Sequence, residues 1–254
     1  MTKIIMHGCN GKMGQVISDI VSADEEAQIV AGIDINPVKK NDYPVFATLA
    51  ECDVQADVII DFAAAVAVDA LLDYSVEKGI PVVLCTTGLS EEQLAKVQES
   101  SKKVAILKSA NMSLGINTIL KLVNQISGLF ADAGFDIEIV EKHHNQKLDA
   151  PSGTALAIAD SINEALDNEY AYKYDRTPDR VKRPKKEIGI SAVRGGTIVG
   201  EHEIIYAGKD EVIEIKHTAY SKAIFANGAV SAAKFLNGAK PGMYNMSDVI
   251  DAQQ

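Results

Sequence analysis

The first 34 residues have the pattern of a strand, a glycine turn, a helix and a second strand, and this unit constrains the fold more than any other feature. Lys3–Met6 is a short apolar strand that runs into Gly8–Gly14, where a glycine recurs every third residue. Apolar residues then follow at helical spacing, and Ala27–Ile33 is an apolar strand that ends at Asp34. Such a unit predicts a dinucleotide-binding α/β domain.

The glycine turn has a direct physical use. Glycines let the backbone approach a pyrophosphate, and the helix N-terminus offers unpaired N–H groups and a favourable dipole. An acid about 20 residues past the last glycine accepts hydrogen bonds from the adenosine ribose. The spacing GxxGxxG departs from the usual GxGxxG, so a purely structural turn is the alternative. The expected cofactor contacts are Gly8, Cys9, Asn10, Gly11, Lys12, Met13 and Asp34.

The alternation of strands and helices continues to residue 107. Strands are expected over Ala56–Asp61, Ile80–Cys85 and Lys103–Leu107, with a helix over Val68–Lys78 and another that starts at the capping box Ser90–Gln93. This rhythm predicts a Rossmann-like, doubly wound parallel sheet, which binds ligands beyond its strand C-termini. Two loops there are candidates for the nicotinamide half of the cofactor, or else plain polar turns: Thr86, Thr87 and Gly88, and Ala110, Asn111, Met112 and Ser113.

The pattern changes after a helix over Gly115–Phe130. Four strand-like segments follow with little helix between them: Phe135–Val140, Glu187–Val193, Thr197–Tyr206 and Glu211–Thr218. They predict a second α+β domain with a mixed or antiparallel sheet. We expect residues 1–114, completed by the C-terminal helix 223–254, to form the dinucleotide-binding domain, and residues 115–222 to form the second. The helical pattern of that C-terminal part runs over Ala223–Leu236. The basic stretch 170–186 reads as a mobile surface loop with solvated charges, or alternatively a cover for an anionic ligand.

Candidate chemistry gathers in Glu141–Ala155, between a strand and a helix of the second domain. His143 or His144 can transfer a proton near neutral pH, and Lys147 supplies charge or a proton. Adjacent histidines on an extended chain point to opposite sides, so at most one is the acid. The helix start at Ser152, Gly153 and Thr154 can bind a carboxylate through N–H and hydroxyl groups. The set fits a small carboxylate-bearing substrate that accepts a hydride and a proton.

Composition excludes several other classes of protein. The formal net charge of −10 argues against general nucleic-acid binding. No apolar run is long enough to cross a bilayer, and the N-terminus lacks the features of a signal peptide. Three cysteines without CxxC spacing suggest reduced thiols in a cytoplasm. A metal site is disfavoured because adjacent histidines are poorly spaced to share an ion. Cys85 is a second candidate nucleophile, although its apolar strand favours an inert thiol.

The sequence resembles the 4-hydroxy-tetrahydrodipicolinate reductase family, formerly called dihydrodipicolinate reductase, almost from end to end. The most specific match is the long signature Glu141–Ala155. Shorter matches are Gly8–Gly14, Asp61-Phe62, Cys85–Gly88, Ala110–Ser113, Arg194–Gly196 with Gly200–His202, and Phe225–Ala229.

The resemblance implies a function and a set of roles. His143 falls on the family's acid/base histidine and Lys147 on a proton donor, while His144, Gly153 and Thr154 fall on substrate-binding positions. The reaction would be reduction of 4-hydroxy-tetrahydrodipicolinate by NADH or NADPH to tetrahydrodipicolinate, with loss of water, in the diaminopimelate route to lysine. The second domain's sheet would carry the substrate and build a homotetramer.

Two departures from the family pattern stand out. Many members have Arg after the ribose acid, where this chain has Ile35, although Lys39 and Lys40 lie close in sequence. We therefore expect NADH to be used at least as well as NADPH. Lys222 stands where an arginine is expected. Two other functions stay open at this point: another NAD-dependent dehydrogenase of small acids or aldehydes, and a non-catalytic dinucleotide sensor, for which the sequence offers no DNA- or partner-binding segment.

Overall fold

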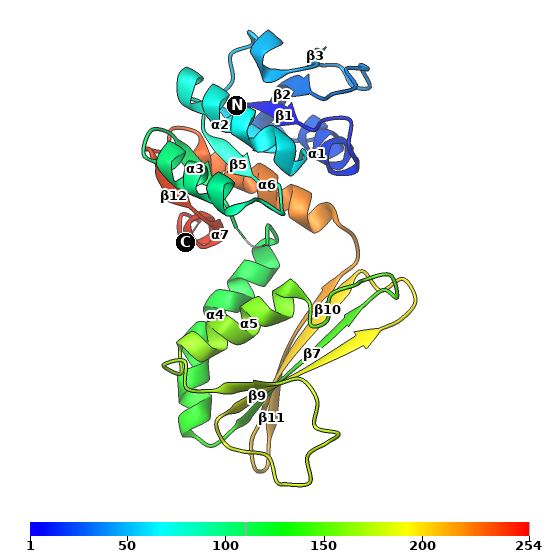
Figure 1. Ribbon diagram of the computed structural model, residues 1–254, viewed down its shortest axis with the longest axis vertical. Coiled ribbons are helices and arrows are strands. Elements are labelled where there is room, and N and C mark those ends of the chain that lie inside the picture. The colour runs from blue at the N-terminus through cyan, green and yellow to red at the C-terminus, as the bar shows by residue number, and fades with distance from the viewer. Residues whose placement is uncertain (110, 254) are drawn as a thin grey trace. The chain divides into compact units, whose positions relative to one another are not determined.

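The computed structural model describes residues 1–109 and 111–253, and the chain divides into two compact units (Figure 1). The first unit is Met1–Leu114 with Ala223–Gln254, and the second is Gly115–Lys222. No helix of the described residues is long and apolar enough to cross a membrane.

The first unit holds a seven-stranded sheet in the order β12-β6-β5-β4-β1-β2-β3, and every paired strand is parallel. Its elements are β1 (Thr2–His7), α1 (Lys12–Ser22), β2 (Ala27–Ile33), β3 (Val45–Phe46), β4 (Val58–Asp61), α2 (Val68–Lys78), β5 (Val82–Leu84), α3 (Glu91–Ser101), β6 (Ala105–Leu107), α6 (Ala223–Leu236), β12 (Gly242–Tyr244) and α7 (Met246–Asp251), with short 3-10 turns at Leu49–Glu51 and Ala65–Ala67. The doubly wound sheet is as predicted.

Alternation along the central strands builds two cores, one on each face of this sheet. In β1, Ile4 and Met6 pack into a core with α1, α6 and α7, whereas Ile5 packs into a second core with α2 and α3. A strand covered on both faces therefore reads as continuously apolar. The C-terminal helix α6 belongs to the first core, so residues more than 200 positions apart in sequence complete one domain.

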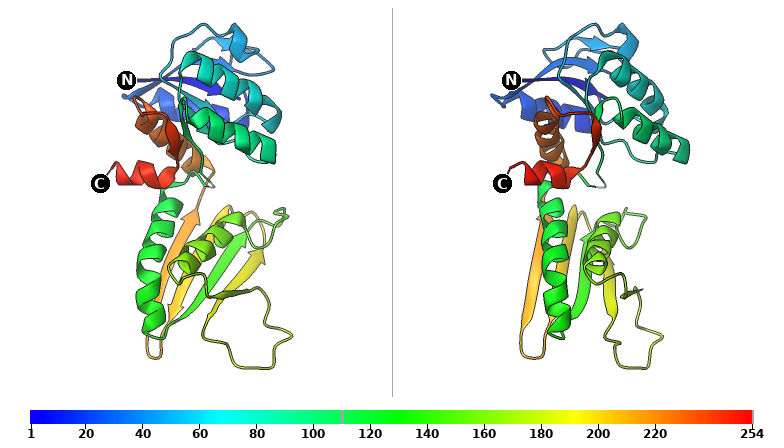
Figure 2. Two further views of the ribbon diagram at one scale, coloured as in Figure 1. Left: turned by 60° about the vertical axis from the view of Figure 1, so that its left-hand side comes forward. Right: turned by 90° about the vertical axis from the view of Figure 1, so that its left-hand side faces the viewer.

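The second unit has one mixed sheet in the order β11-β10-β7-β9-β8. Its elements are α4 (Leu114–Asp132), β7 (Asp136–His143), α5 (Gly153–Glu164), β8 (Ala171–Lys173), β9 (Glu187–Arg194), β10 (Gly200–Ala207) and β11 (Val212–Ala219). β7 is antiparallel to β10 and parallel to β9. Figure 2 shows α4 and α5 on one side of this sheet, where their apolar faces pack against Ile137, Ile139 and Ile204.

The basic stretch 170–186 makes more contacts with the sheet than a mobile surface loop would. Ala171–Lys173 forms the edge strand β8, parallel to β9. Arg176 and Arg183 both donate to the Glu138 carboxylate at 2.9 Å. Glu138 lies against Gly189, where an added Cβ would come within 1.7 Å of its Oε2. The prediction of solvated charges was wrong for these two arginines, because they fasten the loop to the sheet.

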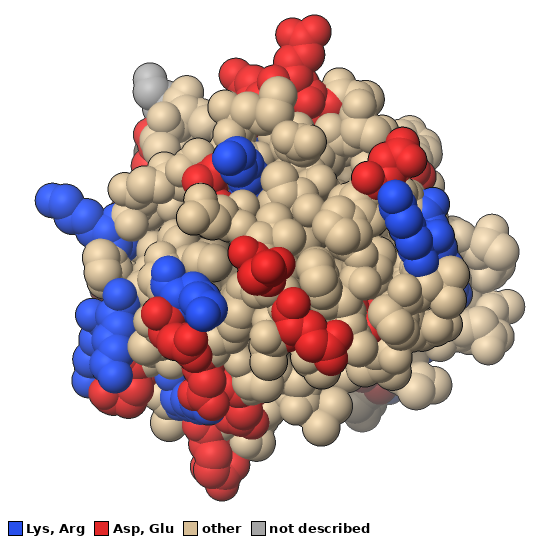
Figure 3. All heavy atoms as spheres, turned by 90° about the horizontal axis from the view of Figure 1, so that it is seen from above, with Lys and Arg blue, Asp and Glu red and all other residues tan. Residues whose placement is uncertain are grey.

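Charged side chains of both signs are mixed on the face shown in Figure 3. Within the first unit, Lys96 pairs with Asp73 at 2.8 Å and Lys234 pairs with Asp24 at 2.7 Å. Exposed pairs of this kind contribute little stability. The net charge of −10 is thus spread over a surface where neighbouring charges are partly neutralised.

Candidate active site

The glycine turn of the first unit leaves no room for side chains. Gly8 has a φ of 80°, the left-handed region that favours glycine. A Cβ on Gly14 would lie 2.3 Å from the carbonyl oxygen of Gly8. Gly11 is the N-cap of α1, no described side chain caps it, and the first turn holds no acid. The turn therefore has the shape and the polarity of a pyrophosphate cradle.

Asp34 lies beside this turn at the end of β2. Its Oδ2 accepts the N–H of Asn10 and its Oδ1 accepts the N–H of Asn36, both at 3.0 Å. The Asn10 side-chain amide donates to the carbonyl oxygens of Asn36 and Val38, and Lys40 Nζ donates to the carbonyl oxygen of Asn10 at 3.2 Å. Segment 35–40 thus folds over the turn and brings the Lys40 ammonium to the turn that also contacts the Asp34 carboxylate.

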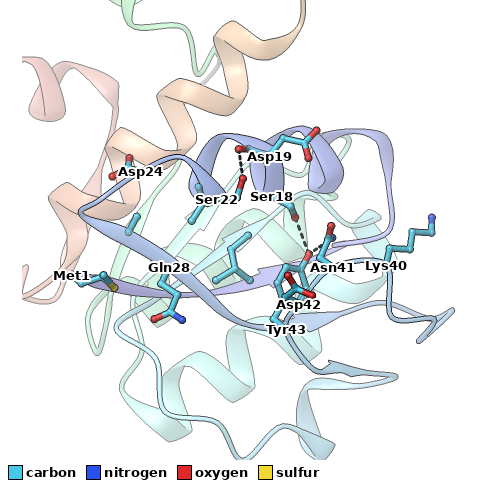
Figure 4. A pocket seen from close by; sticks show the side chains of 13 residues that line it. Met1, Ser18, Asp19, Ser22, Asp24, Gln28, Lys40, Asn41, Asp42 and Tyr43 are labelled. Carbon is cyan, nitrogen blue, oxygen red and sulfur yellow. Dashed lines mark hydrogen bonds between the residues drawn. The ribbon is translucent and has the colours of Figure 1, made fainter.

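Side chains that line a groove beside α1 hold the chain that follows segment 35–40 (Figure 4). The Tyr43 hydroxyl bonds the Ser18 hydroxyl at 2.8 Å and accepts from the Asn41 amide at 2.9 Å. Figure 4 shows Lys40 at the rim with its ammonium pointing away from the other labelled side chains. These bonds anchor the chain next to Lys40, while the Lys40 side chain reaches the carbonyl oxygen of Asn10 in the glycine turn.

The predicted nicotinamide-side loop after β5 has one buried residue, Thr86, and two exposed residues, Thr87 and Gly88. Thr86 is buried, and its hydroxyl donates to Asp61 Oδ2 at 2.5 Å. Asp61 is fully buried and also binds His7 Nδ1 at 2.8 Å. Thr87 and Gly88 are exposed. Burial, helped by Asp61, raises the pKa of the Cys85 thiol well above its ordinary value, so it is a poor nucleophile.

The loop after β6 is similarly divided. Asn111 Oδ1 accepts the N–H of Ser113 at 2.8 Å, which shapes the turn. Met112 is buried in the core shared with α6, and Gly228 makes room for its carbonyl oxygen, which an added Cβ would approach to 1.6 Å. Ala110, a predicted contact, lies outside the described residues. Cys9, another predicted contact, is also fully buried, and its pKa is raised to about 11 by burial and then by the charge of Asp34.

The polar cluster of the second unit is organised around the Glu141 carboxylate. Odd-numbered residues of β7 face α4 and α5, so Glu141 and His143 continue the face formed by Ile137 and Ile139. Glu141 is fully buried, and its Oε2 lies 2.6 Å from His143 Nδ1. Arg194 donates to both carboxylate oxygens at 2.7 and 2.8 Å.

These partners determine the charge of Glu141. Burial alone would raise the pKa of its carboxyl, but the hydrogen bonds from Arg194, His143 and the Ser152 N–H hold the pKa below its usual value. Glu141 is therefore a carboxylate at neutral pH. It accepts the Nδ1–H of His143 and leaves Nε2 as the ring nitrogen without this partner. Nε2 faces the open position of Gly200, where an added Cβ would lie 3.1 Å away.

His202 lies next to His143 on β10, directly across from Glu141 in the sheet register. The two imidazole rings meet edge to face, with centroids 5.2 Å apart. His202 Nε2 bonds the Ser152 hydroxyl at 3.0 Å, and its Nδ1 is buried without a described hydrogen-bond partner. Burial, and then the charges of His143, lowers the pKa of His202 to about 4. His202 is thus uncharged at neutral pH and packs beside His143.

The helix start of α5 contains one buried residue and two that are exposed or partly exposed. Ser152 is the N-cap: its hydroxyl accepts the N–H of Ala155 at 3.1 Å, and its own N–H donates to Glu141 Oε1 at 3.0 Å. Ser152 is 2% exposed, so its polar groups serve the protein itself. Gly153 is exposed and Thr154 is partly exposed. These two residues, rather than Ser152, are positioned to meet a ligand.

Lys147 lies on the connection that links β7 to α5. Its Nζ pairs with Asp149 Oδ1 at 2.8 Å, and this bond lowers the pKa of the Asp149 carboxyl. The positive charge of Lys147 is also one of the causes that lower the pKa of His202. His144 is partly exposed just beyond the end of β7. No group of three or more His, Cys, Asp or Glu that could hold a metal ion occurs in the described part of the chain.

Family models cover both units of the chain. The model described as dihydrodipicolinate reductase, N-terminus, matches residues 2–112, and the model described as dihydrodipicolinate reductase, C-terminus, matches residues 115–250. The chain belongs to the dihydrodipicolinate reductase family.

Similar proteins share this reductase architecture along their whole length. A 4-hydroxy-tetrahydrodipicolinate reductase of Caldanaerobacter subterraneus subsp. tengcongensis is 52% identical over 250 residues, covering 98% of both chains. One of Clostridium novyi is 50% identical over 253 residues and covers 100% of both. The solved, dipicolinate-bound dihydrodipicolinate reductase from Paenisporosarcina sp. TG-14 has a TM-score of 0.82 at 25% identity, covering 98% of this chain and 99% of that one. The protein is accordingly an oxidoreductase with a dinucleotide-binding first unit.

Sequence reasoning missed three members of this reductase's polar cluster as functional candidates. Glu141 is the first residue of the predicted loop, but it was given no role of its own. Arg194 and His202 lie more than 50 residues further along the chain. The register of β7 with β9 and β10 brings them together. Two signals were available: alternation, which places Glu141 and His143 on the same buried face, and the family resemblance at Arg194–Gly196 with Gly200–His202.

The buried, neutral state of His202 predicts a specific loss of stability in acid. Unfolded His202 binds a proton below about pH 6.5, whereas folded His202 does so only near pH 4. In this window the unfolded state binds more protons, so the free energy of unfolding falls as the pH is lowered, by up to about 3 kcal/mol. We expect His202→Gln to flatten this slope in urea unfolding followed by circular dichroism at pH 7.0, 5.5 and 4.5. His144→Gln, which also removes a histidine, should keep the wild-type slope, and equal slopes for His202→Gln and wild type would contradict the assignment.

Proposed function

We propose that the protein reduces 4-hydroxy-tetrahydrodipicolinate to tetrahydrodipicolinate, in the diaminopimelate route to lysine. One hydride and one proton are added to the substrate and one water leaves. The observation that carries this proposal is the His143 imidazole, which is bonded through Nδ1 to the buried Glu141 carboxylate and lies at the end of β7, where the connection with Lys147 and the α5 start begins. The names of the similar proteins agree with this reaction.

His143 is the proton donor in this proposal. In its imidazolium form it holds one proton on Nδ1, toward Glu141, and presents the other on Nε2. The neighbouring His202 stays neutral because its pKa is about 4, so it does not compete as the acid at neutral pH. Lys147 supplies a second proton or a positive charge for a substrate carboxylate, once it exchanges its pairing with Asp149 for the substrate.

The substrate is a small dicarboxylate, and the solved relative with bound dipicolinate supports this class. We assign carboxylate binding to the N–H groups of Gly153 and Thr154, to the Thr154 hydroxyl and to His144. Ser152 has its own N–H and hydroxyl engaged with Glu141, Ala155 and His202. We therefore assign Ser152 a structural role, in contrast to the sequence-based expectation of a substrate contact.

The reductant is a nicotinamide dinucleotide, which supplies the hydride when bound. The Gly8–Met13 turn would hold its pyrophosphate, and Asp34 its adenosine ribose. Thr87 and Gly88, with the Asn111–Ser113 turn, follow β5 and β6 at the end of the sheet where ligands bind. Cys9, Thr86 and Met112 shape these loops from within, because all three side chains are buried.

We further propose a cytoplasmic homotetramer. The three cysteines are free thiols, which suits a reducing compartment. The sheet of the second unit is covered by helices on one face, while its other face carries Val140, Val193 and Ile205 among paired charges such as Lys216 and Glu201. A second copy of this chain would cover that face.

The acid role of His143 predicts a large kinetic defect on its removal. His143→Gln should lower kcat by about 100-fold or more, because general acid catalysis contributes 10²–10⁴-fold. NADH oxidation would be followed with substrate made in situ from pyruvate and aspartate semialdehyde by an aldolase-type synthase. NADH binding, measured by fluorescence, should be unchanged. Gln146→Ala, an exposed neighbour in the same loop, is the control, and a wild-type kcat for His143→Gln would refute the role.

Cofactor preference follows from the charges at the ribose end of the turn. A 2′-phosphate would meet the Asp34 carboxylate without an adjacent arginine, so kcat/KM for NADH should equal or exceed that for NADPH. Lys40→Met should lower kcat/KM for NADPH several-fold more than for NADH, since Lys40 Nζ lies on the turn. Lys39→Met is the matched control. A tenfold preference of the wild type for NADPH would overturn this prediction.

The assembly is tested at the open sheet face. Wild type should elute with the mass of a tetramer in size-exclusion chromatography with light scattering. Val193→Asp, at a side chain that is 44% exposed in the single chain, should shift the mass toward smaller species. Val66→Asp, at an 88% exposed valine of the first unit, should leave the mass unchanged. A wild type that elutes as a monomer would refute the proposed homotetramer.

A further inference from the structure

Glu141 lies on the buried face of β7, where the preceding residues are apolar. Ile137 and Ile139, four and two residues earlier on the same face, lie in the core of the second unit. Burying a carboxylate there has a large desolvation cost, and replacing a buried ion pair by apolar residues is often neutral or stabilising. The presence of a charge at this position therefore calls for an explanation other than stability.

The carboxylate accepts four hydrogen bonds, and together they determine where its partners lie. Arg194 Nη2 and the Ser152 N–H reach Oε1 at 2.7 and 3.0 Å, while Arg194 Nη1 and His143 Nδ1 reach Oε2 at 2.8 and 2.6 Å. Two-pronged guanidinium pairing fixes the plane of the carboxylate. The direction of the His143 ring is then set by a group that cannot rotate.

Arg194 is placed for this task by the sheet. It lies directly across from His143 in the parallel pairing of β7 with β9. Its Nη2 also donates to the carbonyl oxygen of Asp149 at 2.7 Å, on the connection that carries Lys147. The pair thus joins the acid histidine, the lysine loop and the start of α5.

We propose that Glu141, held by Arg194, is a positioning residue for the reduction: it keeps the proton of the neutral His143 ring on Nδ1 and directs Nε2 toward the substrate. The inference rests on the proposed role of His143 as the acid. An amide at position 141 would keep the shape of the side chain but would turn a donor toward Nδ1. It would therefore reverse the tautomer of His143.

The test is Glu141→Gln, with Glu138→Gln as the matched control. Glu138 lies on the same strand, on the opposite face, and is also paired with arginines. Glu141→Gln should lower kcat at least 30-fold with KM changed less than threefold, while Glu138→Gln keeps the wild-type kcat. In ¹⁵N-labelled protein, long-range ¹H–¹⁵N spectra should show His143 protonated on Nδ1 in the wild type and on Nε2 in Glu141→Gln.

A second variant tests the positioning role without removing the buried carboxylate. Arg194→Lys keeps the charge but loses the two-pronged contact, so it should lower kcat at least fivefold with the native circular dichroism spectrum retained. A wild-type kcat for Glu141→Gln, or an unchanged His143 tautomer, would overturn the proposal. If His143→Gln were fully active, the proposed function would fail instead. The NMR result separates the two cases, because it reports the position of the proton without turnover.

Discussion

The buried Glu141 carboxylate is the interaction on which the geometry of the candidate site depends. It links the end of β7, the end of β9 and the first residue of α5 through bonds to His143, Arg194 and Ser152. These segments are separated by up to 53 residues in sequence, yet each supplies a group to this one polar cluster. Because Arg194 and hydrogen bonds offset the desolvation of the carboxylate, the charge can remain where the fold would otherwise place an aliphatic side chain.

The first unit is built to bind a charged dinucleotide through backbone groups. Gly8 and Gly14 allow the turn and the helix to approach each other at distances that a Cβ would forbid. The uncapped start of α1 then offers its N–H groups to an anion. This requires a sheet buried on both faces, because only a rigid β1 and β2 keep the turn and Asp34 in register. The long-range return of α6 completes one of those faces.

Much of this fold follows from local patterns, and the omissions have a physical cause. β2, α2 and α6 match their expected bounds, because long apolar runs and helix signals such as Gly79 mark them clearly. β3, β8 and β12 have only two or three residues each, too few to show a period of two. The sequence alone grouped His143, Lys147 and the helix start as candidates, since they are contiguous. Arg194 and His202 were not, because strand register brings them there.

A motif also does not tell which of its residues meets the ligand and which builds the loop. Thr86, Ser152 and Met112 all belong to loops expected to contact ligands, yet all three are buried. Each satisfies a need of the loop itself: Thr86 binds Asp61, Ser152 caps α5, and Met112 packs beneath α6. A loop that presents backbone N–H groups to a ligand must have its other polar groups paired inside. Polar residues within such motifs are therefore divided between the two tasks, and only the direction of each side chain decides between them.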